Sequence, residues 1–228
     1  MAIPPFYVAP EQMMKDRSDY ARKGIARGKP VVAIEFVDGI LFLADNPSAH
    51  LQKISEIYDR IAFAGVGKYS EFESLRIGGV QLADIRGYSY DREDVTAKAL
   101  ANAYSQVLAQ SFTQQLKPFE VEILIAQVGD GAEDNELWHI LFDGSVTDEE
   151  GFVAMGGQAD ALQAKLAETY QADLDLGGAV GAGVTALAAA NGEAFDAKRL
   201  EAALLDRTRP RRKFRRLAEA DLAGFIQG

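Results

Sequence analysis

The alternation of apolar and polar positions divides the chain into blocks of strands and blocks of helices. A charged helix is predicted over 11–27, because Pro10 suits a first helical position and Gly28 follows the last turn. Two β-rich runs, 31–37 and 40–44, flank Asp38-Gly39 and predict a hairpin. A long helix is predicted over 91–115, with Asp91 and Asp94 as a capping box. Its expected apolar face consists of Val95, Ala99, Ala103, Val107, Leu108, Ser111 and Phe112.

The other segments continue in blocks. Residues 51–58 fit either one helical turn or a short strand. The remaining predicted strands are 60–66, 120–128, 136–142, 151–155, 199–205 and 213–217, and the remaining helices are 68–76, 158–170, 174–190 and 219–225. Blocks of this kind favour antiparallel sheets covered by helix pairs over a doubly wound parallel sheet. The expected fold is therefore an α/β (α+β) four-layer α-β-β-α sandwich. No internal repeat appears, so we expect one domain over 10–228 behind an arm at 1–9.

Composition is that of an ordinary globular protein, with 48% hydrophobic and 25% charged residues among 228. The net charge of −10 argues against non-specific binding to nucleic acid and against docking on anionic membranes. One local exception is a basic cluster near Pro210, interpreted as a solvated hairpin rather than a basic helix face. Its members are Arg207, Arg209, Arg211, Arg212, Lys213, Arg215 and Arg216.

The N-terminal segment does not have the pattern of a signal peptide. Residues 1–7 lack a basic region and an apolar core, and Pro4 and Pro5 interrupt them, which predicts an extended or mobile arm. The longest apolar stretch, 179–190, is broken by glycines and is shorter than the ~20 residues that a membrane span needs. We expect a soluble cytoplasmic protein.

Candidate chemistry is sparse. The absence of cysteine excludes disulfides and Cys-ligated zinc, and His50 and His139 are too isolated to predict a metal site. The glycines between 177 and 183 lie in an alanine-rich helical segment, which favours close packing over phosphate binding. Asp45 and Glu56 could pair as acid and base, although such carboxylates usually lie on the surface. We therefore predict no catalytic residue, no metal and no cofactor.

Five separated stretches resemble the α-type subunits of actinobacterial 20S proteasomes, in the same order along the chain. They are Pro10–Met14, Ala21–Arg27, Leu51–Arg60, Gly87–Arg92 and the segment from Arg207 to Arg216. The resemblance implies the N-terminal-nucleophile hydrolase fold. That fold is the sandwich that the order of elements predicts independently.

The resemblance also implies a subunit without peptidase activity. Active β-type subunits are processed so that a threonine begins the first strand and its free amine acts as the base. Here no threonine occurs between residues 20 and 40, and a helix precedes the strand. Asp45 and Lys53 lie near the positions of a supporting Asp and Lys but have no nucleophile to assist. An active N-terminal-nucleophile peptidase or amidohydrolase, and a stand-alone binding domain of this fold, remain the alternatives.

In the family, α subunits form homo-heptameric outer rings on the β subunits, and their N-terminal arms close the pore. By resemblance, the helix over 10–27 would lie between ring neighbours and against the β ring. Unfolded protein substrates would enter through the gated pore. The gate would comprise Ile3, Pro4, Pro5, Phe6, Tyr7 and Val8, with Pro10 as the turn at its base.

A pocket for activator tails is implied by the same resemblance. Lys53 matches the lysine that receives the C-terminal carboxylate of an activator, such as an ATPase ring, between neighbouring α subunits. A compact ammonium group suits one carboxylate. Gly28 and Gly67 match glycines of the pocket wall, where backbone must approach the tail closely.

Overall fold

Two five-stranded antiparallel sheets are stacked face to face in the computed structural model, which describes residues 9–48, 50–192 and 197–226. The first sheet has the order β10-β9-β2-β1-β8 and the second the order β3-β4-β5-β6-β7. The strands of the first are β1 (Val31–Phe36), β2 (Gly39–Asp45), β8 (Phe152–Met155), β9 (Leu200–Asp206) and β10 (Phe214–Arg216). Those of the second are β3 (Ile54–Tyr58), β4 (Ile61–Gly67), β5 (Val121–Gln127), β6 (Glu136–Ile140) and β7 (Val146–Glu149).

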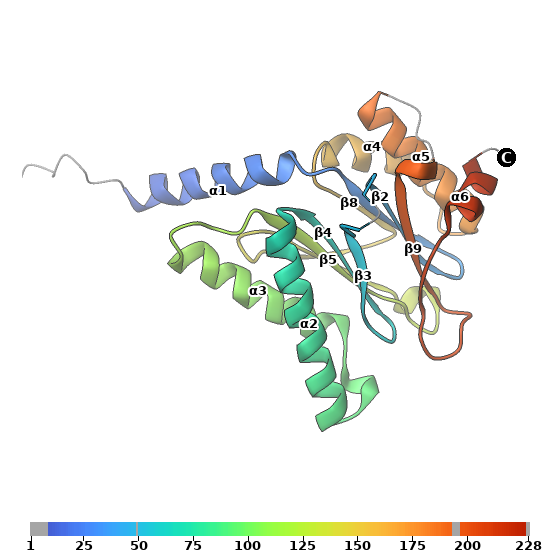
Figure 1. Cartoon of the computed structure of the whole chain (residues 1–228), viewed down its shortest axis with the longest axis horizontal. Coiled ribbons are helices and arrows are strands. Elements are labelled where there is room, and N and C mark those ends of the chain that lie inside the picture. Colours follow the sequence, from blue (N-terminus) through green and yellow to red (C-terminus); the bar gives the residue numbers. More distant parts are fainter. Residues whose placement is uncertain (1–8, 49, 193–196, 227–228) are drawn as a thin grey trace, which may run out of the picture.

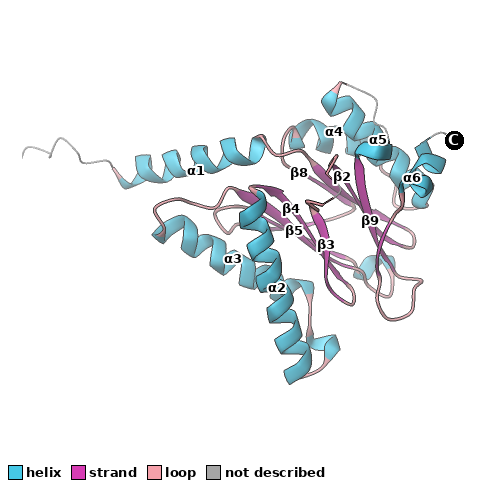
Figure 2. Cartoon of the chain, in the orientation of Figure 1, coloured by secondary structure: helices cyan, strands magenta, loops and turns pink. Residues whose placement is uncertain are grey.

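Helices cover the outer face of each sheet (Figures 1 and 2). Helices α2 (Tyr69–Ser89) and α3 (Ala97–Gln114) pack on the β3–β7 sheet. Helices α4 (Ala159–Thr169), α5 (Leu176–Asn191) and α6 (Glu219–Ile226) pack on the other sheet. Short 3₁₀ turns occupy Arg92–Asp94, Ala132–Asp134 and Ala197–Arg199.

The alternation of side chains along each strand separates three apolar layers. On β1 and β2, Ala33 and Phe42 face the space between the sheets, whereas Ile34 and Leu41 face the helices. Burying both faces of both sheets produces the α-β-β-α sandwich, so the predicted fold is confirmed. Helix α1 (Pro10–Ala26) closes one end of the inner layer with Ala21 and Ile25, and its N-terminal half projects from the body (Figure 1).

Two helix predictions were wrong in detail. Helix α2 extends to Ser89 instead of ending at Arg76. Helix α3 begins at Ala97, where the Thr96 side chain accepts a hydrogen bond from the Ala99 amide; the capping box of Asp91 belongs to the preceding 3₁₀ turn. The buried face of α3 is also rotated from the expected one and consists of Ala97, Leu100, Ala101, Tyr104, Leu108 and Ser111.

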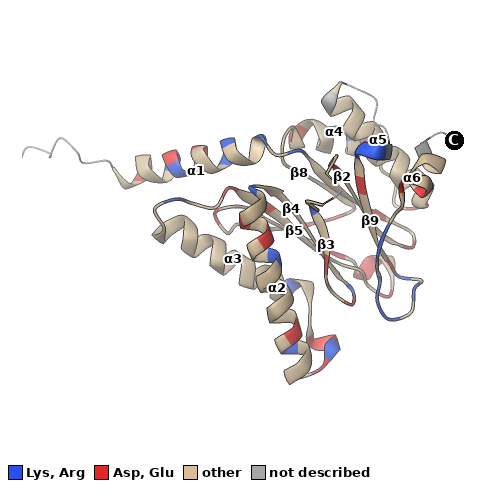
Figure 3. Cartoon of the chain, viewed as in Figure 1, with Lys and Arg blue, Asp and Glu red and all other residues tan. Residues whose placement is uncertain are grey.

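The basic cluster lies on the loop between β9 and β10 and continues onto β10, which carries Arg215 and Arg216 (Figure 3). Several of its guanidinium groups form ion pairs within the chain, so the cluster is not a continuous free cationic face. Arg212 pairs with Glu56, Arg215 Nε lies 3.2 Å from Asp206, and Arg216 lies 3.0 Å from Glu201. In the part of the chain that the structure describes, no helix is long and apolar enough to cross a membrane.

Candidate functional site

A tight turn, Gly28-Lys29-Pro30, joins α1 to β1. The Gly28 amide donates to the Ile25 carbonyl at 2.8 Å, which ends the helix, and the Asp45 amide donates to the Pro30 carbonyl at 3.2 Å. Pro30 and Val31 are buried. The start of β1 is therefore covered on its N-terminal side by a folded helix.

Lys53 lies beside this turn, immediately before β3. Its backbone amide donates to Glu201 Oε2 at 2.9 Å, and the amide of Ile54 donates to Glu201 Oε1 at 3.0 Å. One carboxylate on β9 thus holds the start of β3 with two backbone hydrogen bonds. The Lys53 Nζ donates to the Lys29 carbonyl, which places the ammonium group against the turn.

Gly28 and Gly67 bring two backbone segments into contact at the same place. A Cβ on Gly28 would lie 3.0 Å from the Gly67 nitrogen and 2.7 Å from Val66 Cγ1. Gly67 has a φ of +104°, and its Cβ would lie 2.0 Å from the Glu120 carbonyl oxygen. Both positions require glycine. The structure therefore gathers Lys53, Gly28 and Gly67 around one turn.

Several ion pairs surround Lys53. Asp45 is only 3% exposed and pairs with Lys29 at 3.2 Å and Arg199 at 3.3 Å, while Glu201 pairs with Arg216. Lys53 lies beside these ion pairs. Burial lowers the pKa of Lys53 to about 8, against the charges of Asp45 and Glu201, which raise it. Lys53 is thus mainly an ammonium at neutral pH, and it is poorly hydrated, which suits it to an incoming anion.

Sequence reasoning missed the residues that support Lys53. Glu201 and Arg199 are 148 and 154 positions away in the sequence from the residues they contact, Lys53 and Asp45. No local pattern in the sequence connects either of them with β3 or β2. Asp45 carried a signal, since it ends a wholly apolar strand and a carboxylate there must find a cation. From the sequence, Asp45 was a candidate partner of Glu56 and also lay near the position of a supporting Asp. In the structure Asp45 pairs with Lys29 and Arg199, and Glu56 pairs with Arg212.

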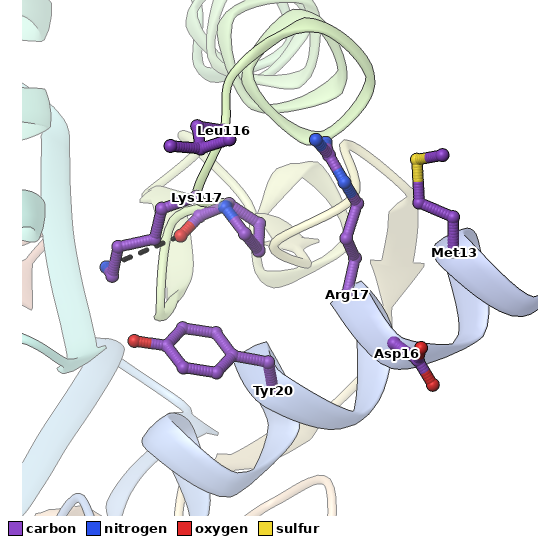
Figure 4. A pocket seen from close by; sticks show the side chains of 7 residues that line it. Met13, Asp16, Arg17, Tyr20, Leu116 and Lys117 are labelled. Atoms are coloured by element: carbon purple, nitrogen blue, oxygen red, sulfur yellow. Dashed lines mark hydrogen bonds between the residues drawn. The ribbon is translucent and has the colours of Figure 1, made fainter. Parts of the chain in front are cut away.

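A second feature is an apolar groove of about 610 Å³ between α1 and the segment that follows α3 (Figure 4). Arg17 spans it and donates to the carbonyls of Phe112 and Gln115. Leu116 is fully exposed beside it, and Met13 and Tyr20 are about half exposed. Helix α1 thus presents apolar side chains that this chain does not cover.

The residues predicted to form a gate, Ile3, Pro4, Pro5, Phe6, Tyr7 and Val8, lie outside the described residues. Pro10 is described and is the first residue of α1. It occupies the position at which proline fits a helix, because the missing N–H would have no partner there.

Comparison with known proteins identifies the fold family. Residues 25–205 match the family model for the proteasome subunit. A proteasome subunit alpha of Streptosporangium roseum is 57% identical over 218 residues, covering 96% of this chain and 84% of the relative. That of Thermomonospora curvata is 58% identical over 93% of both chains, and that of Kineococcus radiotolerans is 56% identical over 98% of both. The chain belongs to the proteasome subunit family.

Within this family the similarity is to the alpha subunits of actinobacteria. All three relatives are named as such, and the sequence identity extends over nearly the whole chain. The resemblance inferred from five short stretches is therefore confirmed. As a proteasome α subunit, the chain assembles with other proteasome subunits.

Proposed function

We propose that this chain is a non-catalytic α subunit that forms the outer homo-heptameric rings of a cytoplasmic 20S core particle, carries its gate and docks activator tails. One observation supports this proposal most strongly. Helix α1 continues through Gly28-Lys29-Pro30 into β1, whose first residue, Val31, is fully buried. A free amine and a nucleophilic side chain would have to meet at that place in an active subunit. A folded helix occupies the approach instead.

The experiment is hydrolysis of fluorogenic peptides by the purified chain, alone and after co-expression with a proteasome β subunit. We expect no hydrolysis by the chain alone, and hydrolysis by the co-assembled particle that disappears when the β nucleophile is removed. Intact mass should show an unprocessed α chain in that particle. Turnover by the chain alone, or a mature form that begins at the first strand, would contradict the proposal.

Exposed apolar side chains support assembly into rings. A second exposed apolar surface, besides the groove on α1, lies at the C-terminal end of α2, where Ile85, Tyr88 and the following Tyr90 are 64%, 93% and 78% exposed. This end projects from the body in Figure 1. Contiguous exposed apolar surface is typical of protein interfaces. We assign the groove to contacts between ring neighbours and this end of α2 to contacts with the β ring.

Deleting residues 2–8 is expected to raise basal peptide hydrolysis of the co-assembled particle severalfold. The deleted arm is rich in apolar residues and would converge with its copies at the ring axis, where removal would open the pore. Hydrolysis of a short peptide should be measured without activator, with particle concentration set by active-site titration. An unchanged rate in fully assembled particles would remove the gate role from these residues.

Activator docking is proposed at Lys53. Its ammonium group lies beside the turn that Gly28 begins and donates to the Lys29 carbonyl. A tail carboxylate bound there would replace the Lys29 carbonyl, a weak acceptor, as the partner of the Lys53 ammonium group. The new hydrogen bond would be charge-assisted.

A further inference from the structure

A buried acid–base cluster lies on the face of the β3–β7 sheet that points toward the other sheet. Glu122 on β5 is only 7% exposed, and its Oε1 lies 2.6 Å from Nε2 of His139 on β6. Glu149 on β7 lies 3.5 Å from the other ring nitrogen of His139. Neither the gate nor the Lys53 site uses these residues directly, and they lie among apolar side chains where an unpaired charge would be costly.

The second oxygen of Glu122 connects the two sheets. The amide of Gly156, just beyond β8, donates to Glu122 Oε2 at 3.0 Å. Gly156 has a φ of +91°, so it turns the chain sharply toward α4. The next amide, that of Gly157, donates to the Gly28 carbonyl at 3.0 Å. The carboxylate of Glu122 therefore fixes the turn that holds Gly28.

This turn is in direct contact with the wall of the Lys53 site. A Cβ on Gly156 would lie 2.6 Å from Val66 Cγ1 and 3.4 Å from the Gly28 oxygen. Gly28 in turn contacts Gly67, and the next carbonyl, that of Lys29, accepts the hydrogen bond from Lys53. A continuous path of short contacts thus runs from His139 through Glu122 and the two glycines to the docking lysine.

The charge balance around Glu122 depends on His139. Beside the two carboxylates and the imidazole, the cavity of about 360 Å³ that Glu122 lines receives Arg22 from α1 and Asp160 from α4. Burial alone would lower the pKa of His139, but the hydrogen bond to Glu122 and the charges of Glu122 and Glu149 outweigh it, and its pKa is raised above 6.5. The folded chain therefore holds a proton on His139 more tightly than an unperturbed imidazole would.

We infer that Glu122 and His139 are positioning residues for the activator-tail site: their hydrogen bond holds the Gly156-Gly157 turn against Gly28 and so sets the wall beside Lys53. The effect on docking rests on the proposed function of Lys53, whereas the effect on the turn does not. Neither residue touches the tail. Each acts through the backbone of the two glycines.

The primary measurement is the hydrogen-exchange protection factor of the Gly157 amide in the full chain. Glu122→Leu removes the acceptor and should lower protection about tenfold relative to the unsubstituted chain below pH 6.5, the effect of losing a hydrogen bond to a charged group. Glu122→Gln keeps an acceptor for Gly156 and should restore most of the protection. The matched control is Glu136→Gln, because Glu136 accepts a hydrogen bond only 2.6 Å long from Trp138 on the same strand, away from the turn.

A pH profile separates positioning from simple packing. His139 has a raised pKa in the folded chain, so its stabilising charge is fully present below pH 6.5 and is lost as the pH rises through the raised value. Wild-type protection at Gly157 should therefore fall as the pH rises above 6.5, whereas Glu122→Gln and His139→Gln should give flat profiles. If Glu122→Leu does not fold, the profiles of these two milder variants decide the question.

Docking is tested on core particles assembled with a β subunit, using an apolar hexapeptide with a free C-terminal carboxylate and its amidated twin. Lys53→Ala should abolish carboxylate-dependent binding, and Glu122→Leu should weaken it severalfold. Retained binding in Lys53→Ala would refute the proposed docking site itself. Loss of binding in Lys53→Ala with wild-type binding in Glu122→Leu, or unchanged protection at Gly157, would overturn the positioning role alone.

Discussion

Replacing Lys53 by alanine is expected to abolish activator-stimulated protein degradation while leaving ring assembly and basal peptide hydrolysis unchanged. The Lys53 ammonium group lies against the Gly28-Lys29 turn and donates to the Lys29 carbonyl. A hydrogen bond between two charged groups contributes about 1.5–3 kcal/mol, or roughly a tenfold to hundredfold change in affinity at each site. Activators that engage several sites of one ring would multiply this loss.

The measurement is the ratio of stimulated to basal degradation, which should fall to about one in the variant. Lys165→Ala is the matched control, because Lys165 on α4 forms only an exposed pair with Glu168 and such pairs contribute little. Lys53→Arg should retain part of the stimulation, since the charge remains but the planar guanidinium cannot reproduce the compact ammonium. Full stimulation in Lys53→Ala particles would refute the assignment.

The sheet framework could be predicted because its signals are local. Asp38-Gly39 between two β-rich runs predicted the first hairpin, and Gly39 indeed pairs with Phe36 at its end. Alternating burial then fixes which side chains face the opposite sheet. The order of blocks predicted the sandwich, because each sheet face must be covered by another layer.

Helix ends were harder because tertiary contacts override local propensity there. Gly78 and Gly79 are poor helix formers, yet α2 continues through them. A Cβ on Gly79 would lie 1.7 Å from the Tyr104 hydroxyl oxygen, so this glycine permits the close approach of α3 rather than ending α2. The edge strand β7 was missed because its residues are largely exposed and polar and show no apolar alternation.

The candidate site also contains residues that could be identified from the sequence and contacts that could not. Lys53, Gly28 and Gly67 were identified by resemblance, and the structure gathers them around one turn. The supporting contacts were not predictable, since Glu201 reaches the Lys53 amide across 148 positions and Gly156 reaches Glu122 across 34. Such pairs depend on how the two sheets stack, and no local sequence pattern indicates that stacking.

Substituting alanine for Gly67 is expected to destabilise the isolated chain by about 3 kcal/mol, combining the strain of a positive φ with a clash. The new Cβ would lie 2.0 Å from the Glu120 carbonyl oxygen, a backbone atom that cannot rotate away, so β4 or β5 must shift. The measurement is the free energy of unfolding in urea, compared with the unsubstituted chain.

The matched control is Gly78→Ala, whose Cβ would meet nothing within 4 Å on the exposed side of α2. Alanine is favoured over glycine inside a helix, so this variant should gain up to about 1 kcal/mol. Opposite signs at the two glycines are expected because only Gly67 has a left-handed φ and a backbone neighbour in contact. Equal stability of the Gly67→Ala and unsubstituted chains would show that β4 can move away from Glu120. The backbone wall formed by Gly67 and Gly28 would then be too flexible to hold an activator tail in a fixed position.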